Sequence, residues 1–515
     1  MRRREFLSLA AASLATPALN ISRAWAAEPG APLLIPEVMD IAPGAGNALD
    51  AIRGTRDFIA GAASETWGYS QEYLGPLLRF RRGRIANISV TNRLDEPITA
   101  HWHGMHVPGY LDGGPQLAFG PGETWAPELP IDHPAATLFY HSHIHGRTGP
   151  QVYRGLAGMI IIDDPGIKDP LPHDYGVNDF PLIVQDRRFD RSGRMIYGLG
   201  MMDRMHGFRG DQILVNGVVR PKLTVPAGLV RLRILNASNA RVYDFRFTDG
   251  RQFHQVASDG GLLDRPLAMA SLQLDGAERA EIVVDFSDRS PVSLVSRDIG
   301  MGGMMNGGMM GDGGGSMMMG DRGMMGDRGR MGDRGMMMGM GGNSGTPLEI
   351  MSFDVGEAAP AGPTRLPTSL PSDAPALGDP VRRRDFTLNM HTRGMMRGGM
   401  MGGDGQMMGI NGEPYVMDRI DETIRAGETE LWRINTDMMM RHTFHVHGTS
   451  FRVVRQNGRP VDSARIGWKD VVRVQGPTEI LLRFDKLASE ETPFMYHCHI
   501  LEHEDVGMMG QFTVT

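Results

Sequence analysis

The chain has 515 residues, enough for about three domains of roughly 150 residues each. Hydrophobic residues make up 41% and charged residues 22% of it, which excludes a wholly disordered protein. The 53 basic and 60 acidic residues leave a net charge of −7, so there is no electrostatic basis for binding nucleic acid. The single cysteine, Cys498, excludes internal disulfides and every metal site built from several cysteines.

Residues 1–26 have the features of an export signal. Arginines at 2–4 are followed by Phe6 and Leu7, and small residues at 24 and 26 frame a cleavage site. The arginine pattern is typical of the twin-arginine translocase, which carries folded proteins. We therefore expect a cleaved signal and a periplasmic protein; a Sec signal or a short anchor is the alternative. No later run reaches the ~18 apolar residues of a membrane span, so no stable membrane insertion is expected.

Alternating apolar and polar residues predict strands throughout the chain. Residues 83–92, 228–236 and 427–435 each begin with a turn glycine and end in Asn. Residues 281–286 resemble residues 479–484, and the two segments are 198 positions apart. The second and third glycine-led segments, which begin at residues 228 and 427, are 199 positions apart. Two matches at nearly one spacing indicate duplicated domains, and short strands between Gly, Pro and Asn turns are typical of all-β folds.

The strand at 228–236 carries the clearest alternation. Val230, Leu232 and Ile234 alternate with Arg231 and Arg233. This period of two predicts a half-buried strand.

We place domain boundaries in two proline-rich stretches, which divides the mature chain into residues 27–168, 169–360 and 361–515. Two Met/Gly-rich segments interrupt the second and third domains, at 301–345 and 394–409; 15 of the 39 methionines fall within 301–340. Neither segment has the composition of a core, because glycine-rich chain loses much entropy on ordering.

Histidines gather in four short clusters. Ten of the 17 histidines belong to them. Residues two apart on a strand project from one face, so each His-x-His pair presents two imidazoles side by side. The four His-x-His pairs therefore predict a shared metal centre. The clusters have these members: His101 and His103; His141 and His143; His442, His445 and His447; His497, His499 and His503.

Cys498 stands between two of these histidines and points to the other face of the strand. Together with His442, His503 and Met508 it provides a set of two imidazoles, one thiolate and a weakly binding thioether. This is the ligand set of a blue-copper electron-transfer site. Zinc would require a fourth strong ligand. One strand would then serve two metal sites joined by a few covalent bonds.

These residues stand in four motifs: HWHG at 101–104, HSHIHG at 141–146, HTFHVHG at 442–448 and HCHILEHEDVGMM at 497–509. From about residue 40 to 515 the sequence resembles the multicopper oxidases, most closely the bacterial copper-efflux oxidase (CueO-like) branch. The resemblance implies an all-β fold of three cupredoxin-like Greek-key β-barrel domains. The metal cluster would lie between the first and third.

The resemblance also implies four copper ions. The type 1 copper would be held by His442, Cys498, His503 and Met508. The type 2 copper would be held by His101 and His445. The type 3 pair would be held by His103, His141, His143, His447, His497 and His499.

Two acids, Asp112 and Glu504, resemble the family's proton-supplying catalytic residues, since reducing dioxygen to water consumes four protons with four electrons. The alternative is a turn aspartate and a residue that only orients a ligand. The other histidines are read as surface or near-ligand residues, among them His106, His133, His145, His173, His206, His254 and His391.

The electron donor is the open question. Thioethers prefer Cu(I), so the Met/Gly-rich segments favour oxidation of Cu(I); low-complexity sequence or a sink for oxidants is the alternative. The resemblance places a substrate copper at Asp437 and Met440, although Asp437 lies five residues before His442, one more than in the family. A laccase-type oxidase of small phenols shares every copper motif. A non-enzymatic copper-sequestering or cell-division scaffold would be expected to lack ligands, and none is missing here.

Overall fold

The computed structural model describes residues 30–42, 44, 46–299, 347–358, 362–372, 376–390 and 408–515. The predicted signal and nearly all of both Met/Gly-rich segments lie outside the described residues. Residues 30–35 form an N-terminal arm that lies beside strand β15 (Lys222–Ala227). The amide of Leu33 donates to the carbonyl of Lys222, and the amide of Lys222 donates to the carbonyl of Ala31. The domain bounds given above remain a prediction.

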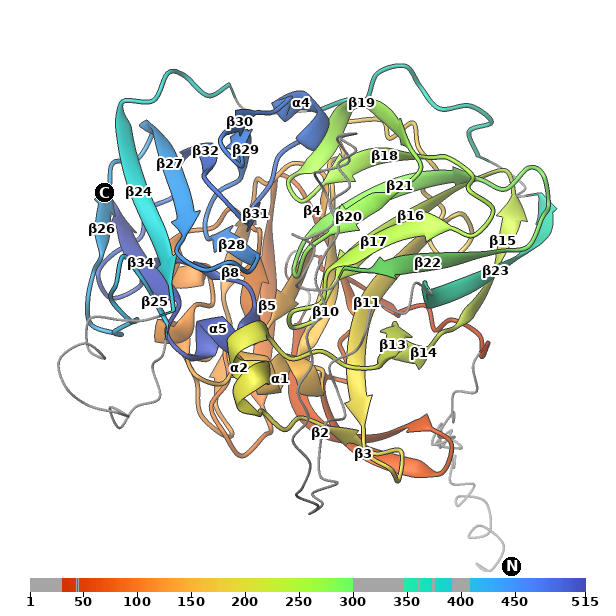
Figure 1. Ribbon diagram of the computed structural model, residues 1–515, viewed down its shortest axis with the longest axis horizontal. Helices are drawn as coiled ribbons and strands as arrows, with labels where there is room; N and C mark the ends of the chain where they lie inside the picture. Colours follow the sequence, from red (N-terminus) through yellow and green to blue (C-terminus); the bar gives the residue numbers. More distant parts are fainter. Residues whose placement is uncertain are drawn as a thin grey trace, which may run out of the picture.

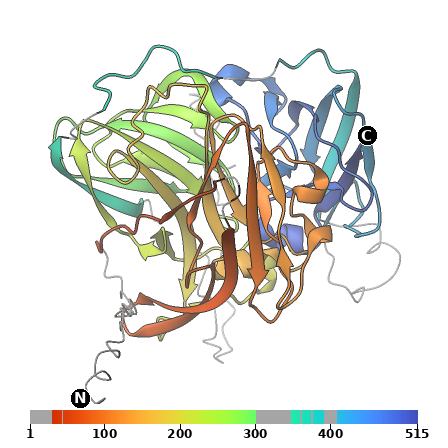
Figure 2. The same ribbon diagram turned by 180° about the vertical axis from the view of Figure 1, so that it is seen from behind.

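Six β-sheets form three pairs that follow one another along the chain, drawn orange, green and blue in Figure 1. Each pair encloses a hydrophobic core of its own. This arrangement confirms the predicted all-β, cupredoxin-like fold. Seen from behind, the strands of the first pair cover the side on which the second and third pairs meet (Figure 2).

The strands have the following bounds, given in sheet order. The first sheet pair comprises β1 (Val38–Asp40), β4 (Leu77–Arg81), β10 (Ala157–Asp163), β9 (Ala136–His141) and β6 (His101–His103), facing β3 (Ala62–Tyr69), β2 (Asn47–Ile59), β5 (Arg84–Asn92), β7 (Thr124–Trp125) and β8 (Glu128–Ile131). The second comprises β14 (Val218–Val219), β13 (Gln212–Val215), β11 (Asp179–Phe189), β12 (Met195–Ile196), β16 (Leu229–Asn236), β21 (Arg279–Asp285), β18 (Phe253–Ser258) and β19 (Gly261–Met269), facing β15, β23 (Leu348–Ala358), β22 (Val292–Asp298), β17 (Tyr243–Phe247) and β20 (Leu272–Leu274). The third comprises β25 (Gly409–Ile410), β24 (Arg382–Asn389), β27 (Thr429–Thr436), β32 (Thr478–Arg483), β29 (Phe451–Gln456) and β30 (Arg459–Pro460), facing β26 (Glu422–Ile424), β34 (Met509–Val514), β33 (Phe494–Cys498), β28 (His442–Val446) and β31 (Val471–Val474).

Helices in the described residues are short and lie in connections. Three of them, α1 (Thr148–Arg154), α2 (Met201–His206) and α5 (Leu501–Asp505), meet where the three sheet pairs come together (Figure 1). The others are α4 (Ser463–Ile466) and the 3₁₀ turns η1 (Gly109–Leu111) and η2 (Pro115–Leu117). No described helix is long and apolar enough to cross a lipid bilayer.

The repeats seen in the sequence occupy equivalent places. Strands β5, β16 and β27 each pair in parallel with the first long strand of their sheet, which is β2, β11 and β24 respectively. β16 also pairs antiparallel with β21, and β27 pairs antiparallel with β32. The two matching segments at one spacing are therefore the same two neighbouring strands in two sheet pairs.

Strand β16 differs from the prediction on its polar face. Val230, Leu232 and Ile234 enter the core as expected, but Arg231 and Arg233 are buried too. Both contact Glu281, and Nη1 of Arg233 also donates to Thr137 Oγ1 of the first sheet pair at 3.1 Å. The strand is covered on both faces because the first sheet pair packs over its charged side, which the sequence alone does not show.

Candidate metal centre

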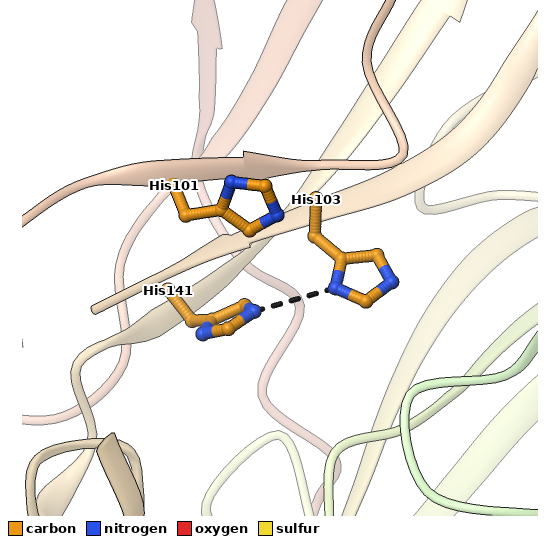
Figure 3. A group of neighbouring side chains, drawn as sticks. All are labelled: His101, His103 and His141. Atoms are coloured by element: carbon orange, nitrogen blue, oxygen red, sulfur yellow. Dashed lines mark hydrogen bonds between the residues drawn. The ribbon is translucent and has the colours of Figure 1, made fainter. Parts of the chain in front are cut away.

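Two neighbouring strands of the first sheet pair carry the first two histidine clusters. β6 consists of His101, Trp102 and His103, and it pairs antiparallel with β9 so that His101 lies opposite His141. The strand alternation turns His101 and His103 to one side and buries Trp102 on the other. His103 and His141 face one another, with 3.3 Å between Nδ1 of the first and Nε2 of the second (Figure 3).

The third sheet pair presents a matching set. On β28 and β33, His445 lies opposite His497 and Phe444 lies opposite Cys498. Alternation therefore places Cys498 in the core of the third sheet pair and His497 on the opposite face, toward the first pair. His143 and His497 meet across this interface, with 3.2 Å between their Nε2 atoms.

All eight histidines predicted to hold the type 2 and type 3 coppers lie together. Their rings stack in pairs across the interface: His101 on His447 at 4.0 Å and His103 on His445 at 3.7 Å between centroids. Nε2 of His447 lies 3.2 Å from Nε2 of His497. The predicted ligands are thus brought into one buried cluster, which we call the histidine cluster, containing these residues: His101, His103, His141, His143, His445, His447, His497 and His499.

The outer ring nitrogens determine which way the inner ones face. Nδ1 of His141 donates to the carbonyl oxygen of Ser142 at 2.8 Å, and Nε2 of His103 donates to Asp470 Oδ1 at 3.1 Å. The two atoms that approach to 3.3 Å, His103 Nδ1 and His141 Nε2, are therefore both unprotonated. Two lone pairs facing each other repel unless a cation lies between them, so these residues fit a bound metal ion.

Other members of the histidine cluster follow the same pattern. The Nδ1 atoms of His101 and His445 donate to the carbonyl oxygens of Asp112 and Asp470, each at 2.8 Å. Their Nε2 atoms are buried without a hydrogen-bond partner among the described residues. Burial lowers the pKa of His143 to about 3 and holds the pKa of His445 well below its usual range, so these imidazoles are neutral and able to bind metal.

Asp112 and Glu504 both touch the histidine cluster. Oδ2 of Asp112 accepts a hydrogen bond from Nδ1 of His447 at 2.7 Å, and its Oδ1 is buried without a partner among the described residues. The Glu504 carboxylate lies 3.1 Å from Nδ1 of His497 and 3.4 Å from Nδ1 of His143. Both acids thus lie beside the histidine cluster, Asp112 from the first sheet pair and Glu504 from the third.

The predicted type 1 ligands form a second, smaller group. Sγ of Cys498 lies 3.5 Å from Nδ1 of His442 and 3.6 Å from Nδ1 of His503, and the two nitrogens are 3.3 Å apart. Nε2 of His503 donates to the carbonyl oxygen of Met205 at 3.2 Å, which leaves its Nδ1 unprotonated and directed at the thiol. Burial raises the pKa of Cys498 to about 12, so only a bound cation would make it a thiolate.

Met508 is tied to this triangle by the backbone. Its carbonyl oxygen accepts a hydrogen bond from the amide of Cys498 at 3.0 Å, and its amide donates to the carbonyl of His503 at 2.9 Å. The side chain is fully buried in the same core as Cys498. Two neutral imidazoles, a buried thiol and a thioether are a donor set that suits copper.

Comparison with known proteins identifies the family. Residues 52–166 and 384–515 match two family models, each described as multicopper oxidase. The chain is 36% identical to the laccase-like multi-copper oxidase CueO of Ochrobactrum sp., with a TM-score of 0.78 over 94% of this chain and 100% of that one. The chain belongs to the multicopper oxidase family.

Two further relatives show the breadth of this family. The McoA multicopper oxidase of Aquifex aeolicus is 30% identical, with a TM-score of 0.76 over 95% of this chain and 100% of that one. The cell division protein FtsP of Sodalis glossinidius is 35% identical, over 100% of this chain and 98% of its own length. Membership in the multicopper oxidases therefore does not by itself decide between an oxidase and a protein of cell division.

The tentative substrate-copper residues, Asp437 and Met440, differ in exposure, and their assignment remains a prediction. Asp437 is exposed, and its Oδ2 accepts a hydrogen bond from Nδ2 of Asn389 at 2.8 Å. Nε2 of His442 has no partner among the described residues, so Asp437 does not contact it. Met440, by contrast, is only 8% exposed and belongs to the same hydrophobic core as Cys498 and Met508.

One residue at the histidine cluster was missed. Asp470 contacts His103 and His445, and the guanidinium of Arg279 holds it, with 2.7 Å from Nη1 to Oδ1 and 2.5 Å from Nη2 to Oδ2. Arg279 begins β21 of the second sheet pair. Asp470 lies in no histidine motif, and its partner is 191 residues away in the chain, so the sequence carried no signal that could have found it.

Proposed function

We propose that this multicopper oxidase couples one-electron oxidation of Cu(I) to the four-electron reduction of dioxygen to water, as part of copper detoxification. The observation that carries the proposal is the complete donor set. Every residue of the four motifs is present, the histidine cluster and the type 1 group are both buried, and Cys498 is bonded directly to His497 and His499.

When bound, four coppers would supply single-electron uptake at His442, Cys498, His503 and Met508, and dioxygen reduction at the eight imidazoles of the histidine cluster. The chain holds the donor atoms in place before any metal arrives, because backbone carbonyls and carboxylates orient the rings. The side chains of both sites are buried.

Asp112 and Glu504 are proposed to pass protons to the site of dioxygen reduction. Oδ1 of Asp112 has no partner among the described residues and can carry a proton while Oδ2 keeps its bond to His447. Glu504 touches His143 and His497, one from each side of the interface. Buried acids at this position can deliver protons without opening the site to solvent.

Cu(I) is the proposed donor because soft thioethers prefer it and the chain has 39 methionines. Small phenols are the alternative donor. A structural relative is described as laccase-like, with activity towards lignin model compounds and lignosulfonate. The arginine-rich start of the sequence supports export through the twin-arginine translocase to the periplasm, where Cu(I) would be met.

Oxygen uptake with Cu(I) as sole reductant, compared with uptake on a phenol, tests the proposal. We expect uptake with Cu(I) at a higher kcat/KM than with the phenol, and no uptake by Cys498→Ser with either donor. Uptake with the phenol alone would favour the laccase. No uptake by copper-loaded protein with either donor would overturn the oxidase proposal.

A role in cell division is the second candidate, favoured by full-length relatives named cell division protein FtsP. Deleting the gene and restoring it as wild type or as Cys498→Ser separates the two. If both versions restore normal division, the division role is independent of oxidation. If deletion changes copper tolerance alone, and only wild type restores it, the division role is excluded.

A further inference from the structure

Helix α2 follows strands of the second sheet pair in the chain, yet it orients a ligand of the type 1 group. The carbonyl oxygen of Met205, in α2, accepts the hydrogen bond from Nε2 of His503 at 3.2 Å. This bond keeps the proton on Nε2, so Nδ1 of His503 is left to face Sγ of Cys498, 3.6 Å away. The position of α2 therefore affects which nitrogen of His503 is available to a metal.

Packing contributes little to the position of α2. The helix has six residues, none of them is buried, and Met201 and Met202 are 71% and 54% exposed. A helix this short is not stable by itself, and it buries little apolar surface that could fix it against a neighbour. Its position must therefore depend on polar contacts made by the segment that contains it.

Glu502 makes such contacts from the third sheet pair. Its side chain is 1% exposed and lies on α5, directly before His503. Oε1 of Glu502 accepts hydrogen bonds from the hydroxyl of Tyr197 and Nδ2 of Asn239, each at 2.8 Å. Its Oε2 accepts the amide of Phe208 at 2.9 Å. Tyr197 comes four residues before α2 and Phe208 two residues after it, so one carboxylate holds both ends of this segment.

The end of α2 also lies directly against the chain that leads into α5. Gly207 follows α2 with a φ of 77°, and a Cβ atom at this position would lie 2.2 Å from Cβ of Ala240 and 2.7 Å from Cγ2 of Ile500. Only glycine allows this approach. The carbonyl of Ile500 in turn accepts the amide of His503 at 2.8 Å. The contact of Glu502 with Phe208 is therefore made where the two segments already touch.

The second sheet pair holds α2 from another direction. Nη2 of Arg188, on β11, donates to Oδ1 of Asp203 in α2 at 3.0 Å and to the carbonyl oxygen of Arg209 at 2.9 Å. These contacts join α2 to its own sheet pair. Glu502 joins it to α5, the helix that carries His503 (Figure 1).

We propose that Glu502 is a positioning residue of the type 1 centre. By holding Tyr197 and Phe208 against α5, its carboxylate keeps the Met205 carbonyl within hydrogen-bond distance of His503. An outer hydrogen bond of this kind fixes the orientation of a metal-binding imidazole and raises its basicity. A more basic imidazole stabilises Cu(II) relative to Cu(I), so Glu502 lowers the reduction potential of the type 1 copper. The inference rests on the type 1 assignment within the proposed function, whichever donor supplies the electrons.

Glu502→Gln tests this role in the full-length, copper-loaded protein. Glutamine keeps the side-chain volume and one acceptor oxygen, but its amide nitrogen cannot accept a hydrogen bond, so one end of the α2 segment is released. We expect the equilibrium constant for reduction of the type 1 copper to rise about tenfold, or 59 mV for one electron, with a changed copper hyperfine splitting in electron paramagnetic resonance. Tyr197→Phe, which removes one hydroxyl outside α5, should shift the potential less and in the same direction.

Asp505→Asn is the matched control, because it makes the same chemical change on the same helix. The Asp505 carboxylate accepts the amides of Thr148 and Gly149, which belong to α1 of the first sheet pair, each at 2.9 Å. We expect a lower thermal midpoint with the wild-type potential and hyperfine splitting. An unchanged potential in both Glu502→Gln and Tyr197→Phe, or an equal shift in Asp505→Asn, would overturn the positioning role. If copper-loaded wild type shows no blue absorption, the type 1 assignment fails, and the positioning role fails with it.

Discussion

The histidine cluster and the type 1 group differ in how the chain holds them. Seven of the eight imidazoles in the histidine cluster contact a chain oxygen through their outer nitrogen, on elements of the first and third sheet pairs. In the type 1 group, among the residues that the structure describes, only His503 has such a contact, and it comes from α2 of the second pair. The histidine cluster is thus oriented by the two sheet pairs that carry it, whereas one ligand of the type 1 group is oriented by a contact from the second pair.

The largest effect should come from replacing Cys498, which joins the two sites. Cys498→Ser should abolish the blue absorption and all oxidase turnover, because the thiolate supplies both the charge-transfer band and the covalent path to His497 and His499. The fold and part of the cluster copper should remain, as measured by circular dichroism and metal content. A blue, active variant would contradict the type 1 assignment.

Replacing the acids should affect only the interior site. Asp112→Asn or Glu504→Gln should slow reoxidation by dioxygen about 10²-fold, since each removes a proton donor. Anaerobic reduction followed by reoxidation in stopped flow measures the two halves separately. Reduction by the donor serves as the control, and slower reduction would mean that these acids act elsewhere.

Arg279 of the second sheet pair should affect copper binding at the histidine cluster as well. Arg279→Gln should weaken copper binding there by about 10- to 100-fold, because Asp470 would no longer be held against His103 and His445. It should also lower the free energy of unfolding by about 3–5 kcal/mol, since it leaves a buried carboxylate unpaired.

Arg384→Gln is the matched control for this change. Arg384 is buried and paired with Glu430 and Glu422 within the third sheet pair, away from the histidines. It should lower thermal stability to a similar degree without loss of copper. Equal copper loss in both variants would show that Arg279 acts through stability alone.

The smallest effect should follow from shortening the Met/Gly-rich segment. Residues 301–340 can be replaced by a Gly/Ser turn, because β22 and β23 are antiparallel neighbours with Ser296 opposite Leu348. We expect kcat/KM for Cu(I) to fall about two- to fivefold through a lower effective concentration of Cu(I). Phenol oxidation should stay equal or rise.

Copper content and thermal midpoint must match between the shortened and full-length proteins for this comparison. Equal losses for both donors would indicate damage to the shared electron path. An unchanged kcat/KM for Cu(I) would show that these methionines are low-complexity sequence without a role in copper supply.

Much of the fold could be predicted because strand patterns are local. Turn glycines such as Gly83 and Gly427 adopt positive φ values of 79° and 78° before strands that the alternation had located. The repeat spacing indicated duplicated domains, and the matching segments are indeed equivalent strands: β16 pairs with β21 in the second sheet pair, as β27 does with β32 in the third. The burial of Arg231 and Arg233 could not be predicted, since it depends on a neighbouring sheet pair.

The sequence by itself determined the donor atoms, because a His-x-His or His-Cys-His strand sorts its side chains onto two faces through the backbone geometry alone. Only the tertiary structure decided which groups orient those donors. Asp470 and Met205 lie in no metal motif, and they contact the ligands, as Arg279 contacts Asp470, only because three sheet pairs pack together. Contacts between residues far apart in the chain depend on that packing, and no local pattern records it.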